Sequence, residues 1–108
     1  MIAQITVREL DRILKAGEAV LLLDVRQPEE HSLAALPNSV LIPLHQLPQR
    51  FAEVQPPPDA QVVVYCHHGV RSLRGAAFLA QQGFERVASL AGGIDAWSRE
   101  IDPRVPCY

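Results

Sequence analysis

Residues 62–72 read Val-Val-Val-Tyr-Cys-His-His-Gly-Val-Arg-Ser, and this stretch is the most informative part of the chain. A β-branched run ends on Cys66, a turn containing Gly69 follows, and a helical pattern begins near Arg71. We therefore predict a buried strand over 61–65 and a helix from Ser72 that ends at Gly83. The thiol between them is expected to sit in a cup of backbone N–H groups at the helix N-terminus, which favours the thiolate near neutral pH.

The rest of the chain alternates between strand and helix patterns. Thr6 and Glu9 form a capping box that starts a helix ended by Gly17, and 19–25 is a continuous apolar run, typical of a strand covered on both faces. Further elements are expected as short strands over 4–5, 39–42 and 86–90, and as short helices near 27–30, 45–51 and 94–99. This order predicts an α/β fold with three layers, in which helices cover both faces of a central, mostly parallel sheet of four or five strands. We expect a single domain over 1–108, with an irregular tail packed along the surface.

Composition excludes several classes of function. Of the 108 residues, 48% are hydrophobic and 20% are charged, and the formal net charge is −2. This balance gives no reason to expect nucleic acid or an anionic membrane as a partner. Since the sequence also contains neither a membrane-spanning apolar run nor a signal peptide, we expect a cytoplasmic protein.

The two cysteines, Cys66 and Cys107, are too few for a disulfide scaffold. Cys107 is either a resolving thiol that attacks an oxidised or persulfidated Cys66, or a residue of the tail without a partner.

Several residues near Cys66 are candidates for binding an anion. Gly69 permits a turn whose amides point inward, and Arg71 either holds a substrate oxyanion or braces the loop. Asp24 and Arg26 follow a neighbouring strand, at the sheet edge where ligands bind in parallel α/β folds. They form an ion pair that braces the floor of the pocket, or they cap the strand end.

We predict no metal site and no cofactor. His67 and His68 are adjacent, so their rings are expected to point apart, and no cysteine or carboxylate lies at ligand spacing. They are expected to line the rim of the pocket and tune its charge. His31 and His45 are expected to be surface or packing residues.

Over nearly its whole length, the chain resembles single-domain rhodanese sulfurtransferases. The resemblance is carried by motifs in the family's order and spacing: Asp24-Val25-Arg26, Glu30, Ile42-Pro43-Leu44, Cys66-His67-His68-Gly69-Val70-Arg71-Ser72, Gly83-Phe84, Val87, Leu90, Gly92-Gly93 and Ala96-Trp97.

The resemblance implies that Cys66 takes a sulfur atom from thiosulfate or a related persulfide donor and passes it to cyanide, a thiol or a sulfur-carrier protein. The loop amides of His67, His68, Gly69, Val70, Arg71 and Ser72 would surround the bound sulfur. Two alternatives remain. One is a non-catalytic rhodanese-like module that binds a protein partner, and the other is a phosphatase or arsenate reductase on the same fold.

Three features bear on these alternatives. Four residues separate Cys66 from Arg71, whereas the phosphatases and arsenate reductases of this fold have five, so a tetrahedral oxyanion has less room here. The family's usual histidine is missing from the segment Ala34-Ala35-Leu36-Pro37-Asn38-Ser39, which is expected to alter local hydrogen bonding only. His67 and His68 are partly protonated at neutral pH, so thiosulfate is expected to bind weakly.

Overall fold

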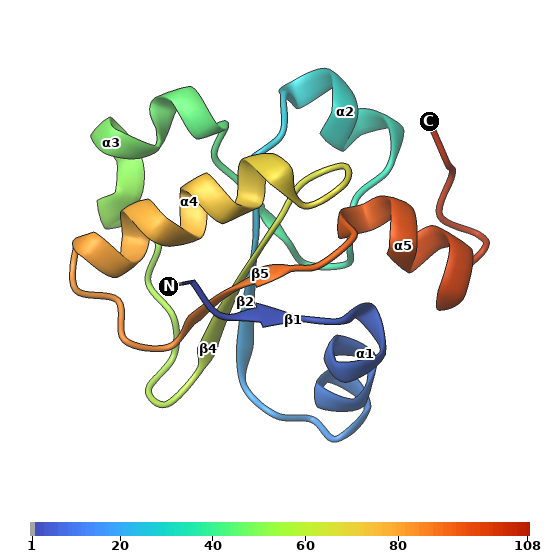
Figure 1. Cartoon of the computed structure of the whole chain (residues 1–108), viewed down its shortest axis with the longest axis horizontal. Helices are drawn as coiled ribbons and strands as arrows, with labels where there is room; N and C mark the ends of the chain where they lie inside the picture. The colour runs from blue at the N-terminus through green and yellow to red at the C-terminus, as the bar shows by residue number, and fades with distance from the viewer. Residues whose placement is uncertain (1) are drawn as a thin grey trace.

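The computed structural model describes residues 2–108, and its centre is one sheet of five parallel strands in the order β1-β5-β4-β2-β3 (Figure 1). The strands are β1 (Gln4–Ile5), β2 (Val20–Asp24), β3 (Val40–Leu41), β4 (Gln61–Tyr65) and β5 (Val87–Leu90). The predicted α/β class is confirmed. The sheet has five strands, where four or five were expected, and no antiparallel pair occurs among the described residues.

Helices cover both faces of the sheet, with α1 and α5 on one side and α3 and α4 on the other (Figure 1). The α-helices are α1 (Val7–Lys15), α2 (Pro28–Leu33), α3 (Leu47–Arg50), α4 (Val70–Gln81) and α5 (Gly93–Glu100). Single 3₁₀ turns, Leu44–Gln46 and Phe51–Glu53, flank α3. None of the helices in residues 2–108 is both long and apolar enough to cross a membrane.

The central strand β4 explains why both faces must be covered. Its side chains alternate, so Val63 and Tyr65 pack in the core on the α1 and α5 side, while Val62 and Val64 pack in the opposite core with Leu79 of α4. A strand that buries both faces requires the near-continuous apolar sequence from which it was predicted.

Local signals identified most elements, with errors of one or two residues at the ends. The capping box of Thr6 and Glu9 is present, with Glu9 N donating to Thr6 Oγ1 at 3.1 Å. Helix α4 begins at Val70 and not at Ser72, because Gly69 adopts a φ of +102° and is its N-cap. The helix expected over 45–51 is broken into a 3₁₀ turn, one α-helical turn and a second 3₁₀ turn, and Pro48 lies in the first turn of α3.

Candidate active site at the carboxyl edge of the sheet

Cys66 directly follows β4 and is 1% exposed. Its Sγ accepts hydrogen bonds from the backbone N–H groups of Gly69 at 3.1 Å and Ser72 at 3.3 Å. The sulfur also faces the N-terminus of α4, where unpaired N–H groups and the helix dipole favour negative charge. The Cys66 loop, residues 66–72, therefore directs two backbone donors at the thiol sulfur.

The tight turn of this loop depends on Gly69. A Cβ atom at this position would lie 3.2 Å from Gly92 N and 3.3 Å from Leu90 O. Because its φ is also positive, any other residue would be both strained and crowded. The glycine thus brings the loop close to the end of β5.

A buried pair of serines lies behind the sulfur. The Ser72 Oγ is 3.5 Å from Cys66 Sγ and 2.7 Å from Ser89 Oγ, and both serines are 0% exposed. Ser89 was not predicted as a site residue, although a polar side chain inside an apolar strand was a usable signal. The hydroxyls supply a further polar contact on the buried side of the thiol.

Arg71 braces the loop. Its Nη1 and Nη2 donate to Glu30 Oε1 and Oε2 at 2.7 and 2.9 Å, a bidentate pair that ties the start of α4 to α2. Hydrogen bonding from Arg71 outweighs burial and lowers the pKa of Glu30 from 4.5 to about 2. Of the two roles open to Arg71 from the sequence, the geometry supports bracing.

Glu30→Gln is expected to destabilise the fold by roughly 1–2 kcal/mol at neutral pH, because it removes a charge-assisted pair that is partly screened by solvent. The folded pKa lies below the unfolded value, so this stabilisation is present above pH 4.5 and is lost as pH falls towards 2. Urea unfolding at several pH values should show the gap between wild type and variant closing over that window. A constant gap would contradict the assignment. Glu53→Gln, which disrupts an exposed pair with Arg50, is the control and should cost less.

Asp24 and Arg26 form a fully buried ion pair at the carboxyl end of β2, which favours the bracing alternative. Asp24 Oδ1 accepts from Arg26 N at 3.0 Å and from Nε at 2.9 Å, and Oδ2 accepts from Nη2 at 2.7 Å. Burial alone would lower the pKa of Arg26, but hydrogen bonds to Asp24 and Tyr108 raise it. Arg26 also donates to the carbonyl of Ala34, in the segment that lacks the family histidine.

Another histidine, His31, also contacts this pair. Its Nδ1 lies 2.8 Å from Asp24 Oδ2.

The C-terminal residue Tyr108 reaches this network, which no sequence pattern indicated. Its hydroxyl accepts from Arg26 Nη1 and donates to Glu30 Oε2, both at 2.7 Å. Burial, together with the hydrogen bond to Glu30, raises the pKa of Tyr108 to about 12 despite the contact with Arg26. The phenol thus connects the buried ion pair to the brace of the Cys66 loop.

The two loop histidines do not point apart, so that expectation is wrong. The rings of His67 and His68 stack with centroids 3.9 Å apart and planes inclined by 29°. The ring of Tyr108 also stacks on His67, at 3.9 Å and 6°. Desolvation and the neighbouring His68 lower the pKa of His67. A lower pKa reduces the positive charge on His67 near neutral pH, and the weak thiosulfate binding expected from the sequence stays a prediction.

The remaining predicted loop residue, Val70, is 67% exposed and carries its amide into the first turn of α4. Cys107 is a free, exposed thiol, with its Sγ 3.1 Å from Ser98 Oγ of α5. In this arrangement its contact is with α5, and neither cysteine is in a disulfide.

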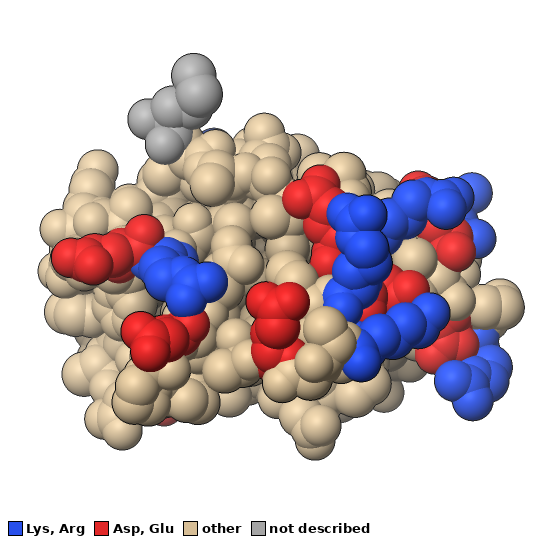
Figure 2. Space-filling model, turned by 90° about the horizontal axis from the view of Figure 1, so that it is seen from below, with Lys and Arg blue, Asp and Glu red and all other residues tan. Residues whose placement is uncertain are grey.

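Charged residues gather away from the Cys66 loop. Figure 2 shows Lys and Arg interspersed with Asp and Glu on one side of the molecule. A surface hollow of about 630 Å³ lies there, lined by Arg8, Asp11, Arg12, Lys15, Trp97, Glu100, Ile101, Asp102 and Arg104. Arg8, Lys15 and Arg104 in this lining are each paired with a carboxylate, so the surface of the hollow is mixed in sign and not basic. No residue of the Cys66 loop lines it.

Comparisons with known proteins point to one family. The profile of the rhodanese-like domain matches residues 6–100. A sulfurtransferase of Allochromatium vinosum is 41% identical over 105 residues, which are 97% of this chain and 96% of that protein. The crystal structure of a rhodanese-related protein from Thermoplasma volcanium matches with a TM-score of 0.81 and 31% identity, covering 92% of this chain and 93% of the other.

A longer protein, a thiosulfate sulfurtransferase from Pseudomonas aeruginosa, matches with a TM-score of 0.81 and 28% identity. The match covers 91% of this chain but 19% of that one. The domain profile matches most of the chain, and the chain folds into a parallel sheet that carries the expected cysteine loop. The chain therefore belongs to the rhodanese-like domain family.

Proposed function

We propose that the protein is a sulfurtransferase that works through a persulfide on Cys66. The observation that carries the proposal is the buried Cys66 Sγ, held by the amides of Gly69 and Ser72 at the N-terminus of α4. The similarity to a sulfurtransferase along nearly the full length of both chains supports it.

The reaction is a pair of displacements at sulfur. The Cys66 thiolate attacks the outer sulfur of thiosulfate, the S–S bond breaks, and sulfite leaves with the electron pair of that bond. An acceptor such as cyanide then attacks the outer sulfur of the persulfide, which forms thiocyanate and restores the thiolate. Charge and atoms balance in each step, and the nucleophile needs no separate base once it is ionised.

The charge of the Cys66 loop bears on the choice of donor. The guanidinium of Arg71 is paired with Glu30, and the pKa of His67 is lowered. The loop therefore carries little unpaired positive charge that could bind a dianion. We therefore favour a less charged donor, such as a persulfide or 3-mercaptopyruvate, over thiosulfate. The acceptor is a thiol, cyanide or a sulfur-carrier protein.

Phosphatase chemistry has weaker support. Such a reaction requires a guanidinium directed at the transferred oxyanion, whereas both terminal nitrogens of Arg71 face Glu30. The non-catalytic binding module is the other alternative, and it leaves unexplained why two amides converge on a buried thiol.

The test is intact-mass measurement after incubation with thiosulfate or with 3-mercaptopyruvate. We expect the mass to rise by one sulfur atom, more completely with 3-mercaptopyruvate, and cyanide to remove that sulfur as thiocyanate. Cys107→Ser is the matched variant and should load equally well, because Cys107 contacts α5. No gain with either donor would overturn the proposal in favour of the binding module.

A further inference from the structure

The first turn of α5 is joined to the Cys66 loop by its backbone. The N–H groups of Ile94 and Asp95 donate to the carbonyls of Cys66 and His67 at 2.9 and 3.0 Å. A Cβ on Gly93 would lie 2.4 Å from Cys66 O and 2.5 Å from His67 O, so only glycine permits this approach. The position of Asp95 relative to the loop is therefore set by main-chain contacts.

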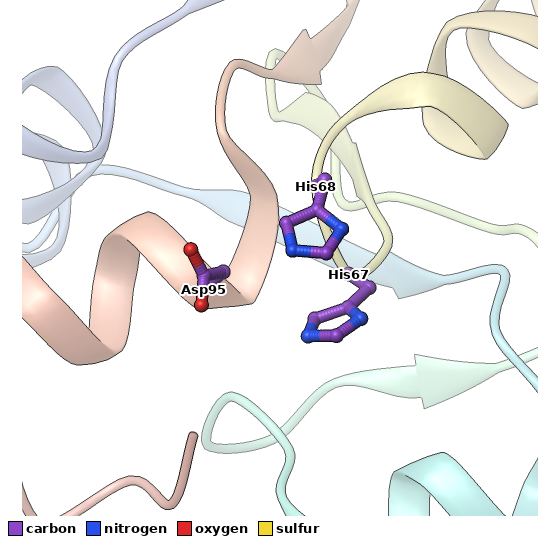
Figure 3. Close-up of side chains that lie close together, drawn as sticks. All are labelled: His67, His68 and Asp95. Carbon is purple, nitrogen blue, oxygen red and sulfur yellow. The ribbon is translucent and has the colours of Figure 1, made fainter. Parts of the chain in front are cut away.

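This junction brings together three side chains of types that commonly ligate metals. His67 and His68 lie one beside the other and face the carboxylate of Asp95 (Figure 3). One potential ligand atom from each residue lies within 4.8 Å of the others. The sequence did not suggest this set because Asp95 is distant in the chain, and the expectation that no carboxylate accompanies the histidines is wrong for the folded protein.

Neighbouring aromatic rings fix the orientation of the His67 ring. The rings of Tyr108 and His68 both stack on it with centroids 3.9 Å away, inclined by 6° and 29°, which places them on opposite faces of the His67 ring. Its Nε2 is buried and has no hydrogen-bond partner among residues 2–108. A buried polar atom without a partner is unfavourable, and an ion bound there would satisfy it.

We propose that His67, His68 and Asp95 bind one zinc ion beside the Cys66 loop. Two imidazoles and a carboxylate suit zinc, and three protein ligands leave a fourth tetrahedral position for water. This proposal concerns binding and does not depend on the proposed sulfur transfer.

Binding requires the three side chains to rearrange. Ligand atoms around tetrahedral zinc lie roughly 3.4 Å apart, so the three must close slightly, and His68 must turn until the ion lies in its ring plane. His68 is exposed, which leaves it room to do so. Asp95 Oδ2 accepts from Arg99 Nε at 2.9 Å, which orients the carboxylate and leaves Oδ1 for the metal.

The test excludes the thiols as ligands by using the full chain with Cys66→Ser and Cys107→Ser. Zinc titration by calorimetry should show one site, and cobalt should give the visible absorption of a tetrahedral N/O site. In this background, His68→Gln and Asp95→Asn are each expected to weaken zinc binding at least tenfold and to reduce the cobalt signal. His45→Gln, which alters an exposed histidine outside the cluster, should bind as the parent does.

Two results would overturn the proposal. One is the absence of saturable zinc binding by the thiol-free protein. The other is an affinity that neither His68→Gln nor Asp95→Asn changes. Circular dichroism of each variant must match the parent, and Asp95→Glu, which keeps a carboxylate, should retain more affinity than Asp95→Asn.

Discussion

Cys66→Ser is expected to abolish sulfur transfer, with thiocyanate formation falling by a factor of about 10⁴ or more, to the background rate. A serine hydroxyl is not ionised near neutral pH and forms no persulfide, so both displacement steps are lost. The measurements are thiocyanate production from each donor and intact mass after loading.

The fold should survive this substitution. Oγ of serine can accept the hydrogen bonds that Gly69 N and Ser72 N now donate to Sγ. We expect the unfolding free energy to change by no more than about 1–2 kcal/mol, mainly from replacing a buried thiol by a smaller polar group. Activity that persists in Cys66→Ser would show that the reaction uses another nucleophile, and Cys107→Ser tests the second thiol.

Arg26→Met is expected to have the largest effect on stability, about 3–5 kcal/mol. Both side chains of the Asp24–Arg26 pair are 0% exposed, so removing the guanidinium leaves a buried carboxylate without its cation. The substitution also removes the donor to Tyr108 and to the carbonyl of Ala34. Urea unfolding monitored by the fluorescence of Trp97 measures the change.

Two controls separate this effect from a general loss of charge. Arg104→Met removes a guanidinium that is 90% exposed and paired with Asp102, and should change stability far less than Arg26→Met does. The double variant Asp24→Asn, Arg26→Met should be more stable than the sum of the single effects predicts, because the uncompensated charge is gone. Two other side chains contact Asp24 Oδ2: the Tyr65 hydroxyl donates to it at 3.2 Å, and His31 Nδ1 lies 2.8 Å away. A loss below about 1 kcal/mol in Arg26→Met would show that these two contacts suffice to hold Asp24.

The extent to which the sequence predicted the site depended on the distance between partners. The capping box of Thr6 and the turn at Gly69 involve neighbours in the chain, so short patterns predicted them. Arg71 had two open roles because its partner Glu30 is 41 residues away, on another helix. Tyr108 was missed because the tail has no periodic pattern, and its contacts with Arg26 and Glu30 span 82 and 78 residues.

Local patterns were enough to predict the parallel sheet and the position of Cys66 between β4 and α4, because apolar runs, helix starts and glycine turns depend on local backbone preferences and burial. The surroundings of that thiol depend on how the chain packs. The parallel sheet brings the carboxyl ends of β2, β4 and β5 to one edge, where α2, α5 and the tail converge on the loop. The brace of Arg71, the stacking of Tyr108 on His67 and the approach of Asp95 to the histidines arise there, since they depend on packing between segments that are distant in the chain.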